Sequence, residues 1–390
     1  MSVFKRENLF FVIVALFWFA QYIYIPFFSP YLIALGISAS VVGFILGSYG
    51  FTQLVLRVPL SIVGSRSGTH KTIIGAGILC TILATASPLV SDSWIAFLMT
   101  RALAGVASAT WIAYTAYLLE GAEDAANQRM GYLMAANTAG CFSSQIIGTL
   151  LYGRIGMRML FAVALGVAAL AFILLLLTPF KRRAISEERG PAIASNLAGV
   201  LRNKNFWVCS SLALVMLFLL YATTFGFTGV FAQEALGAGS LVLGVLSILF
   251  QFCSMLISMG FGKLGRRRLP ERGIITMAFV LIAAHCVAIP FCGIAGIILI
   301  QIVAGVGFSI GNVLTLANAG RELDDSQQIL SMGLFQTKYS FGMLSGPAFT
   351  GVMFDHTGNN YFLTFSMLAI VAAAGAVFTL VAYRNPPIQS

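Results

Sequence analysis

Charged side chains are scarce in this sequence, at 9% of 390 residues, whereas an ordinary soluble domain has about 25%. Hydrophobic residues make up 59% of the chain, which is more apolar surface than a soluble core of this size can bury. The scarcity of charge therefore excludes an ordinary soluble globular protein. It indicates that lipid surrounds most of the chain.

Reactive groups are also scarce. The six cysteines lie in apolar runs without a CxxC pair, which predicts small buried side chains rather than disulfides or metal ligands. The sequence has three scattered histidines, no HExxH motif and no carboxylate pair inside an apolar run. A membrane-embedded enzyme or lipid transferase needs such groups to converge at membrane depth. We therefore expect no enzymatic activity, no metal and no cofactor.

Apolar segments long enough to cross about 30 Å of hydrocarbon recur along the chain. Six precede and six follow a polar stretch: 9–34, 39–63, 72–91, 94–118, 131–152, 159–180, 206–231, 240–262, 273–291, 294–317, 330–353 and 361–383. Each must be helical, because lipid cannot satisfy backbone hydrogen-bonding groups. We predict an all-α membrane protein with twelve transmembrane helices in two pseudo-symmetric six-helix bundles, 1–180 and 206–390, joined by a cytoplasmic linker, 181–205.

Positive charges gather at one set of predicted helix ends. Eighteen of the twenty-three Lys and Arg residues fall in the cytoplasmic segments if the N-terminus is placed in the cytoplasm. The positive-inside rule then places both termini there. We expect a multi-pass protein of the bacterial cytoplasmic (inner) membrane. The same asymmetry explains the net charge of +10 without nucleic acid as a partner.

Three features of the first half recur in the second at a nearly constant spacing. They are Gly68 and Gly265 (265 − 68 = 197), Ala104-Gly105-Val106 and Ala304-Gly305-Val306 (offset 200), and Met130-Gly131 and Met332-Gly333 (offset 202). Such steady offsets predict a duplicated six-helix unit. Two parallel repeats around an axis normal to the membrane are expected to enclose a central cavity.

Several motifs resemble those of the major facilitator superfamily. Leu56-Arg57-Val58-Pro59, followed by the loop from Ser65 to Lys71, is similar to that family's motif between its second and third helices. Arg101 with Gly105 resembles the motif of the fourth helix, and the run from Gly342 to Gly351 resembles the glycine-proline helix motif, here in the eleventh helix. The resemblance covers essentially the whole chain and implies a secondary transporter.

The sequence departs from the family pattern at two places. Ser65 occupies the loop motif's acidic position, and Ser144-Gln145 replaces a glycine-proline pair in the fifth helix, where efflux branches usually carry that motif. We expect Arg66 to pair with an acid after the fourth helix and Ser65 to cap the eleventh helix, which gives a weak cytoplasmic latch. The predicted gating residues are Ser65, Arg66, Gly68, Glu120, Asp124, Gly342, Gly346 and Pro347.

Three cations but no acid lie in the middle of predicted spans: Arg57, Arg101 and Lys338. Each costs about 2.5–3.5 kcal/mol near the bilayer centre, so each should face water, a partner or a ligand. Cations without counter-ions favour an anionic ligand. The alternatives are that Arg57 reaches the helix end and that Arg101 bonds carbonyl groups of the first helix. Lys338 has no evident partner in the sequence, which favours a ligand role.

Uncharged polar side chains are candidates to line the same cavity. Tyr49, Gln53, Arg57 and Ser61 recur every four residues, which indicates a wet helix face. The predicted substrate-binding residues are Arg101, Lys338, Arg57, Gln21, Gln53, Trp111, Asn137, Tyr221, Gln251, Asn312 and Gln336. For any single uncharged member the alternative is an interhelical hydrogen bond, at about 0.6 kcal/mol each.

These features predict a secondary active or facilitative transporter that moves a small organic solute by alternating access, with an anion favoured. The alternative is a proton-coupled multidrug or metabolite exporter, against which the lack of a mid-span carboxylate counts. The expected partners are the solute and the lipid bilayer, with a co- or counter-transported ion left open. The chain is expected to act as a monomer.

Overall fold

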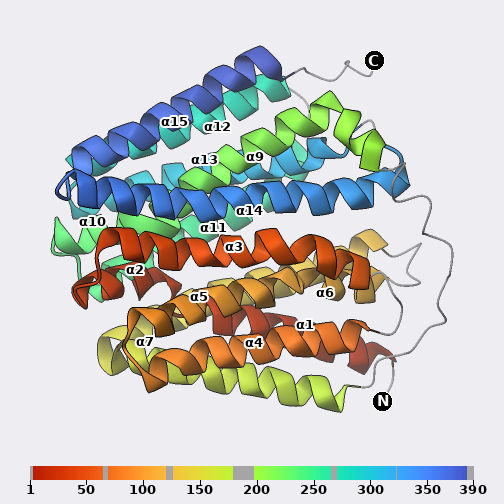
Figure 1. The fold of residues 1–390 in the computed structure, drawn as a ribbon. Coiled ribbons are helices and arrows are strands. Elements are labelled where there is room, and N and C mark those ends of the chain that lie inside the picture. The colour runs from red at the N-terminus through yellow and green to blue at the C-terminus, as the bar shows by residue number, and fades with distance from the viewer. Residues whose placement is uncertain are drawn as a thin grey trace.

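The computed structural model describes residues 3–64, 69–119, 126–178, 197–264, 270–321 and 323–383, in which every regular element is helical (Figure 1). The longer helices are α1 (Val3–Tyr22), α2 (Ile25–Ala34), α3 (Ala39–Gly64), α4 (His70–Val90), α5 (Trp94–Ala109), α6 (Trp111–Leu119), α7 (Ala126–Leu177), α9 (Lys204–Ala222), α10 (Thr228–Glu234), α11 (Ser240–Leu264), α12 (Glu271–Ala288), α13 (Ile294–Ala319), α14 (Asp325–His356) and α15 (Tyr361–Ala382). A π-helical turn, Thr223–Phe227, joins α9 to α10, and a 3₁₀ turn, Ile289–Phe291, follows α12.

Ten helical segments of the described chain are long and apolar enough to cross a membrane. One of them, Gln128–Leu177, lies within α7, which has 52 residues and turns at Gly156, where the positive φ of 72° suits glycine. α14 has 32 residues but is not among the ten, since Gln336, Lys338 and several hydroxyl side chains make it more polar. The chain is therefore an all-helical membrane protein, and the count of twelve crossings stays a prediction.

The helix bounds follow the predicted spans, with breaks that hydropathy alone does not reveal. The predicted span 9–34 is divided between α1 and α2, and Pro26 lies in the first turn of α2, where its missing N–H leaves no bond unmade. The predicted span 206–231 is interrupted by the π-helical turn. Most of the predicted linker, 181–205, lies outside the described residues.

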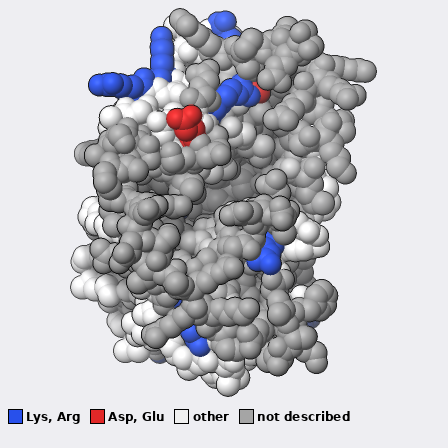
Figure 2. Space-filling view, turned by 90° about the vertical axis from the view of Figure 1, so that its right-hand side faces the viewer, with Lys and Arg blue, Asp and Glu red and all other residues white. Residues whose placement is uncertain are grey.

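The helices form two halves that lie side by side (Figure 1). The N-terminal half, residues 3–178, holds α1 to α7, and the C-terminal half, residues 197–383, holds α9 to α15. Both chain ends lie at one side of the molecule, here called the terminal side, while α2 and α10 lie at the distal side. On the terminal side, Figure 2 shows more Lys and Arg than Asp and Glu among the coloured residues.

α3 and α14 form the longest contact between the halves (Figure 1). Gly43, Gly47 and Gly50 lie about one turn apart on α3 and let the two backbones approach. A Cβ on Gly43 would lie 2.2 Å from the carbonyl oxygen of Pro347, and one on Gly47 would lie 2.6 Å from that of Leu344. Small residues at this spacing are how membrane helices pack closely.

Asp355, near the distal end of α14, caps the N-terminus of α3. Its Oδ1 accepts the backbone N–H of Ala39 at 3.2 Å, and its Oδ2 accepts that of Ser40 at 2.9 Å. A carboxylate is favoured there, because the first N–H groups of a helix lack partners within the helix and carry partial positive charge. The C-terminal half thus supplies the cap for a helix of the N-terminal half.

Two glycine contacts match the repeat seen in the sequence. A Cβ on Gly105 would lie 2.4 Å from the carbonyl oxygen of Tyr49, and one on Gly305 would lie 3.1 Å from that of Phe250. The glycines are 305 − 105 = 200 residues apart and their contacts 250 − 49 = 201. The same helix pair therefore packs through an equivalent glycine in each half.

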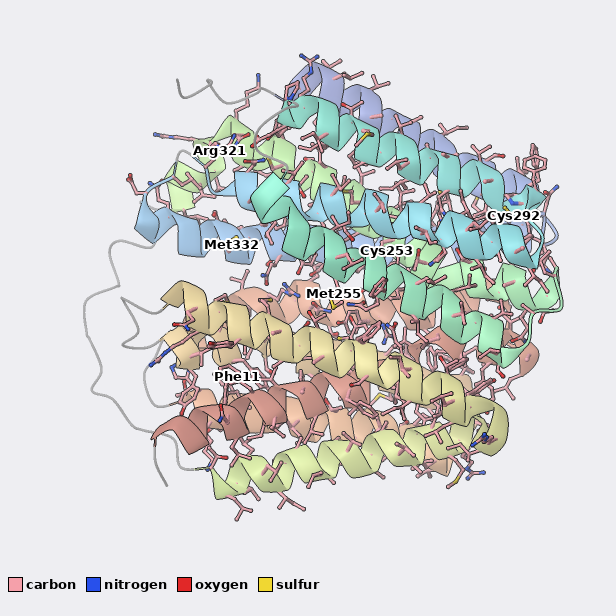
Figure 3. The ribbon with its side chains drawn as sticks, turned by 180° about the vertical axis from the view of Figure 1, so that it is seen from behind. Phe11, Cys253, Met255, Cys292, Arg321 and Met332 are labelled. Atoms are coloured by element: carbon pink, nitrogen blue, oxygen red, sulfur yellow. The ribbon has the colours of Figure 1, made fainter. Side chains whose placement is uncertain are left out.

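An ion pair joins helix ends at the terminal side of the C-terminal half. Arg321, which Figure 3 labels there, donates to both carboxylate oxygens of Glu271 at 3.0 and 2.8 Å, and Tyr383 donates its O–H to the same carboxylate at 2.8 Å. The hydrogen bond to Glu271 raises the pKa of the Arg321 guanidinium. This cluster ties the start of α12 to the ends of α13 and α15.

Candidate functional site

Arg101 lies two turns into α5, which begins where the Ser93 side chain accepts the N–H of Ala96. Its side chain is buried, with 6% of its surface exposed. The guanidinium carbon lies 4.4 Å from the centre of the Tyr49 ring, a cation–π contact. Among the described residues, the Arg101 Nε has no hydrogen-bond partner. A buried cation is thus left with an unused donor.

A chain of hydrogen bonds runs beside Arg101. The Tyr49 hydroxyl donates to Ser108 at 2.9 Å, and the Ser108 hydroxyl donates to Gln21 Oε1 at 3.1 Å. The oxygen of the Gln21 amide is therefore occupied, while its Nε2 has no partner among the described residues. The hydrogen bonds thus orient the Gln21 amide so that its donor, Nε2, is the atom without a partner among the described residues.

These residues surround a cavity between the halves. Gln21, Tyr49, Arg101 and Tyr221 line it together with Tyr22, Ile25, Phe28, Leu46 and Phe225. The recess covers about 430 Å³ including its opening to solvent, of which about 20 Å³ can hold the centre of a water molecule. A water needs roughly 10–15 Å³ by this measure, so the cavity has room for one or two waters. In this structure the cavity is therefore too small for an organic ligand.

Two residues of the C-terminal half cover this cavity. The ring of Tyr221 on α9 stacks on that of Tyr49, with the centres 6.0 Å apart. Phe225, in the π-helical turn, lies 5.3 Å from Tyr221 and 6.5 Å from Tyr22 between ring centres. The charge thus comes from one half, and an aromatic cover comes from the other.

Arg57 belongs to a separate cluster toward the terminal side. It donates to Gln53 on its own helix, and on α14 it donates to Gln336 and, at 3.0 Å, to the hydroxyl of Tyr339. Three residues that the sequence predicts as substrate-binding, Arg57, Gln53 and Gln336, therefore meet each other. They form a hydrogen-bonded bridge between the halves rather than part of the cavity.

Lys338 lies apart from Arg101. Its ammonium group donates to the hydroxyls of Ser210 at 3.1 Å and Ser211 at 2.7 Å, and it lies 4.4 Å from the centre of the Trp207 ring. These partners are all on α9, within the C-terminal half. Lys338 lines neither of the two cavities described here, so the structure does not bring the two cations around one ligand.

The other predicted lining residues are dispersed. Trp111 packs on Trp18, with ring centres 5.4 Å apart. Asn312 lines a second recess in the C-terminal half, which covers about 350 Å³ including its opening to solvent, of which about 70 Å³ can hold the centre of a water molecule. Its other walls are mostly apolar: Met216, Leu217, Leu220, Phe250, Phe308 and Ser309. Asn137 and Gln251 are partly exposed and line neither cavity.

The predicted gating residues fall into two groups. On α14, a Cβ on Gly342 would lie 2.3 Å from the carbonyl oxygen of Leu214, and one on Gly346 would lie 2.2 Å from that of Phe218. Pro347 faces Gly43 on the other side, so α14 is tightly packed between α9 and α3. The remaining group, Ser65, Arg66, Gly68, Glu120 and Asp124, lies outside the described residues.

Sequence reasoning missed several residues of the site. Ile25, Phe28, Leu46 and Phe225 line the cavity, but they are apolar residues inside apolar runs, so the sequence does not distinguish them from other core residues. Tyr22 follows the predicted Gln21 directly, at the break between α1 and α2, and borders the same space. Asp355 was visible only as an acid at a helix end, and its partner is 316 positions away.

All six cysteines are free, and Figure 3 shows Cys253 and Cys292 at well separated places. Among the described residues, no group of three or more His, Cys, Asp and Glu side chains is arranged to hold a metal ion.

Comparison with known proteins identifies the fold. A sequence model of the Major Facilitator Superfamily matches residues 10–323. No curated protein matches the chain. Solved structures do. The nucleoside transporter NupG is similar at 13% identity and a TM-score of 0.78, with 98% of this chain and 100% of that one covered.

Two further structures are similar. A bacterial homologue of the human lysosomal transporter Spinster, in an inward-facing and unoccupied conformation, has 16% identity and a TM-score of 0.74, with 98% of this chain and 96% of that one covered. The human organic anion transporter MFSD10 has 17% identity and a TM-score of 0.65, with 97% and 100% covered. At these identities the likeness shows the fold alone.

Proposed function

Because this chain belongs to the major facilitator superfamily and is a membrane transporter, we propose that it carries a small organic anion by alternating access. One observation supports the proposal most directly: the buried residue Arg101 lines a cavity between the halves, and its Nε has no acceptor among the described residues. A charge buried without a counter-ion is costly, and an anion that enters the cavity would supply the missing acceptor.

The other cations do not compete for this role. Arg57 is engaged by two amides and a phenol, and Lys338 by two serines and the Trp207 ring. Among the described residues that line the cavity there is no carboxylate. A cationic drug would therefore meet an unneutralised positive charge, which disfavours it by like-charge repulsion.

The contacts between the halves suit a moving boundary. Tyr49 and Tyr221 stack on each other at this small cavity, so a ligand larger than a water must part them. On the distal side the Asp355 cap holds α14 to α3, and toward the terminal side the Arg57 bridge joins the same two helices. In our proposal these two contacts break and form in turn as the halves rock about the site.

We extend the proposal to the topology predicted from sequence. Counting α7 as two crossings around Gly156 and adding α14 to the apolar segments gives twelve. Residues 1–180 and 206–390 would form the two bundles, the 181–205 segment would link them, and both termini would be cytoplasmic in a bacterial inner membrane. The excess of cations on the terminal side supports that orientation. A monomer suffices, since the site lies within one chain.

The names of two similar structures bear on the solute. One is an organic anion transporter and another a nucleoside transporter. The first agrees with an anionic solute, but the proposal rests on Arg101 and not on that likeness.

Solute counterflow in proteoliposomes tests the proposal. We expect uptake of a labelled monocarboxylate by the purified protein, its loss in Arg101→Gln, and its retention in Gln301→Leu, a buried change at the equivalent position of the other half. Lys338→Gln, measured alongside, tests the sequence prediction that this lysine also binds. Uptake of lipophilic cations that depends on a proton gradient, with no response to any anion, would replace the proposal with the exporter.

A further inference from the structure

Resting on the proposed function, we infer that the substrate is a flat monocarboxylate whose body is an aromatic or conjugated ring. Its carboxylate is held by Arg101 and Gln21, and its ring is held by the aromatic walls that the two halves contribute.

The charge of the ligand follows from the lining. Arg101 is the one charged side chain among the described residues around the cavity. A single carboxylate neutralises it. A second carboxylate would be buried without a partner, because Arg57 and Lys338 are engaged elsewhere, and burial of an unpaired charge is strongly unfavourable.

The position of the carboxylate follows from the free donors. Two buried nitrogen atoms of the lining lack a partner among the described residues: Arg101 Nε and Gln21 Nε2. Their side chains are 6% and 3% exposed. Ser108 donates to the Gln21 oxygen, so the amide atom left without a partner is the donor Nε2. Two unused donors among the lining residues match a carboxylate, which only accepts.

The shape of the body follows from the remaining walls. Five rings line the cavity, from Tyr22, Phe28, Tyr49, Tyr221 and Phe225, and the other two lining residues are Ile25 and Leu46. Tyr49 and Tyr221 are almost parallel, at 17°, with their centres 6.0 Å apart. When the halves part slightly, a flat ring can stack between or beside them, whereas a puckered ring of similar size cannot.

Four probes of similar size separate these features. Benzoate is the flat monoanion, cyclohexanecarboxylate is a puckered one, benzamide is flat and neutral, and isophthalate is a flat dianion. The test is to measure the binding of each probe to the purified protein by calorimetry, together with the thermal shift that each probe causes. We expect cyclohexanecarboxylate to bind about fivefold more weakly than benzoate, and benzamide and isophthalate at least about tenfold more weakly.

Two variants assign these differences to residues. Tyr221→Leu should remove the preference for benzoate over cyclohexanecarboxylate while both still bind better than benzamide. Gln21→Leu should weaken both carboxylates alike. Gln301→Leu serves as the control, and ligand-free melting of each variant confirms that it folds.

The outcomes distinguish the inference from the proposal beneath it. If none of the anions binds, the proposed function itself fails. If anions bind through Arg101 but cyclohexanecarboxylate equals benzoate, or isophthalate equals benzoate, the proposed function stands and this inference is overturned. A preference for benzoate that survives in Tyr221→Leu would also overturn it, because the ring selectivity would then come from elsewhere.

Discussion

The two halves of this protein build the same helix contact around different chemistry. Gly105 packs on Tyr49 in the N-terminal half, and Gly305 packs on Phe250 in the C-terminal half. One turn before each glycine, at equivalent positions (301 − 101 = 200), lie Arg101 and Gln301. Ser108 and Phe308 are related by the same offset. The N-terminal site is thus charged and hydrogen-bonded, and its counterpart is neutral and mostly apolar.

The recurring glycines serve helix packing, whereas the side chains around them differ between the halves and can serve function. The glycines recur because backbones must approach closely in each half, while the side chains around them are free to diverge. Both Arg101 and Gln301 are buried with an unpartnered polar atom among the described residues, but only Arg101 carries charge. We infer that the N-terminal half binds the charged group of the ligand and that the C-terminal half supplies the aromatic residues that cover the cavity.

The largest expected effect comes from removing the charge of Arg101, compared with a neutral change at the equivalent position, Gln301. Arg101→Gln should weaken benzoate binding by at least about tenfold and up to about a hundredfold, since a hydrogen bond to a charged group contributes about 1.5–3 kcal/mol. Gln301→Leu should change it by less than about twofold, since that side chain does not line the cavity. Calorimetry on both variants checks the comparison, and equal losses would show that the halves bind the anion jointly.

The next effect concerns the glycines themselves. A Cβ on Gly105 would lie 2.1 Å from the Thr52 hydroxyl and 2.4 Å from the Tyr49 carbonyl, whereas one on Gly305 would lie 2.8 Å from the Cys253 Cβ. Overpacking costs about 1–3 kcal/mol, so Gly105→Ala should lower the melting temperature in detergent more than Gly305→Ala. A larger loss from Gly305→Ala would mean that the C-terminal contact is the tighter one.

A third difference lies where each half meets the other on the distal side. Asp355 caps Ala39 and Ser40 of α3. The equivalent positions are Gly153 and Ser240 (355 − 153 = 202; 240 − 40 = 200), which are also in contact: a Cβ on Gly153 would lie 3.1 Å from the Ser240 hydroxyl. Only one of the two equivalent contacts therefore carries an acid.

Removing that acid should shift the balance between conformations. Asp355→Asn weakens a charged cap by about 1 kcal/mol, which moves the population about fivefold toward a state open on the distal side. Distances between spin labels at Leu35 and Leu241, in a cysteine-free background, report that opening. His356→Gln is the matched control on the same helix end, and an identical distance distribution in Asp355→Asn and wild type would count against the latch.

Periodicity and charge predicted much of this architecture. Hydropathy located the helices to within a few residues over most of the described chain, and constant offsets indicated the repeat before any contact was known. Of the predicted site residues, Arg101, Gln21 and Tyr221 line one cavity, because each is a polar group at membrane depth in a helix that borders the other half.

Spacing along a helix predicts which residues share a helix face, but it does not predict which residues of other helices they contact. Lys338 satisfies the same rule as Arg101, yet two serines of α9 lie close enough to bind it. Phe225 gives no signal in an apolar run, and the π-helical turn that places it over the cavity has no hydropathy signature. The sequence did not predict the partners of Asp355, because Ala39 lies 316 positions away and meets it only in the folded structure.

The smallest expected effect tests the hydrogen-bond chain. Ser108→Ala removes the hydroxyl that accepts from Tyr49 and donates to Gln21 Oε1. Water can replace it, because both residues border a cavity that water enters. Benzoate affinity should therefore fall by only about threefold. Ser309→Ala, in the apolar counterpart, should change nothing. The chain acts by turning the Gln21 amide, so Ser108→Ala should have no further effect once Gln21→Leu is present. Independent, additive losses in that double-mutant cycle would mean that Ser108 acts on the ligand directly and that Gln21 is oriented by its own packing.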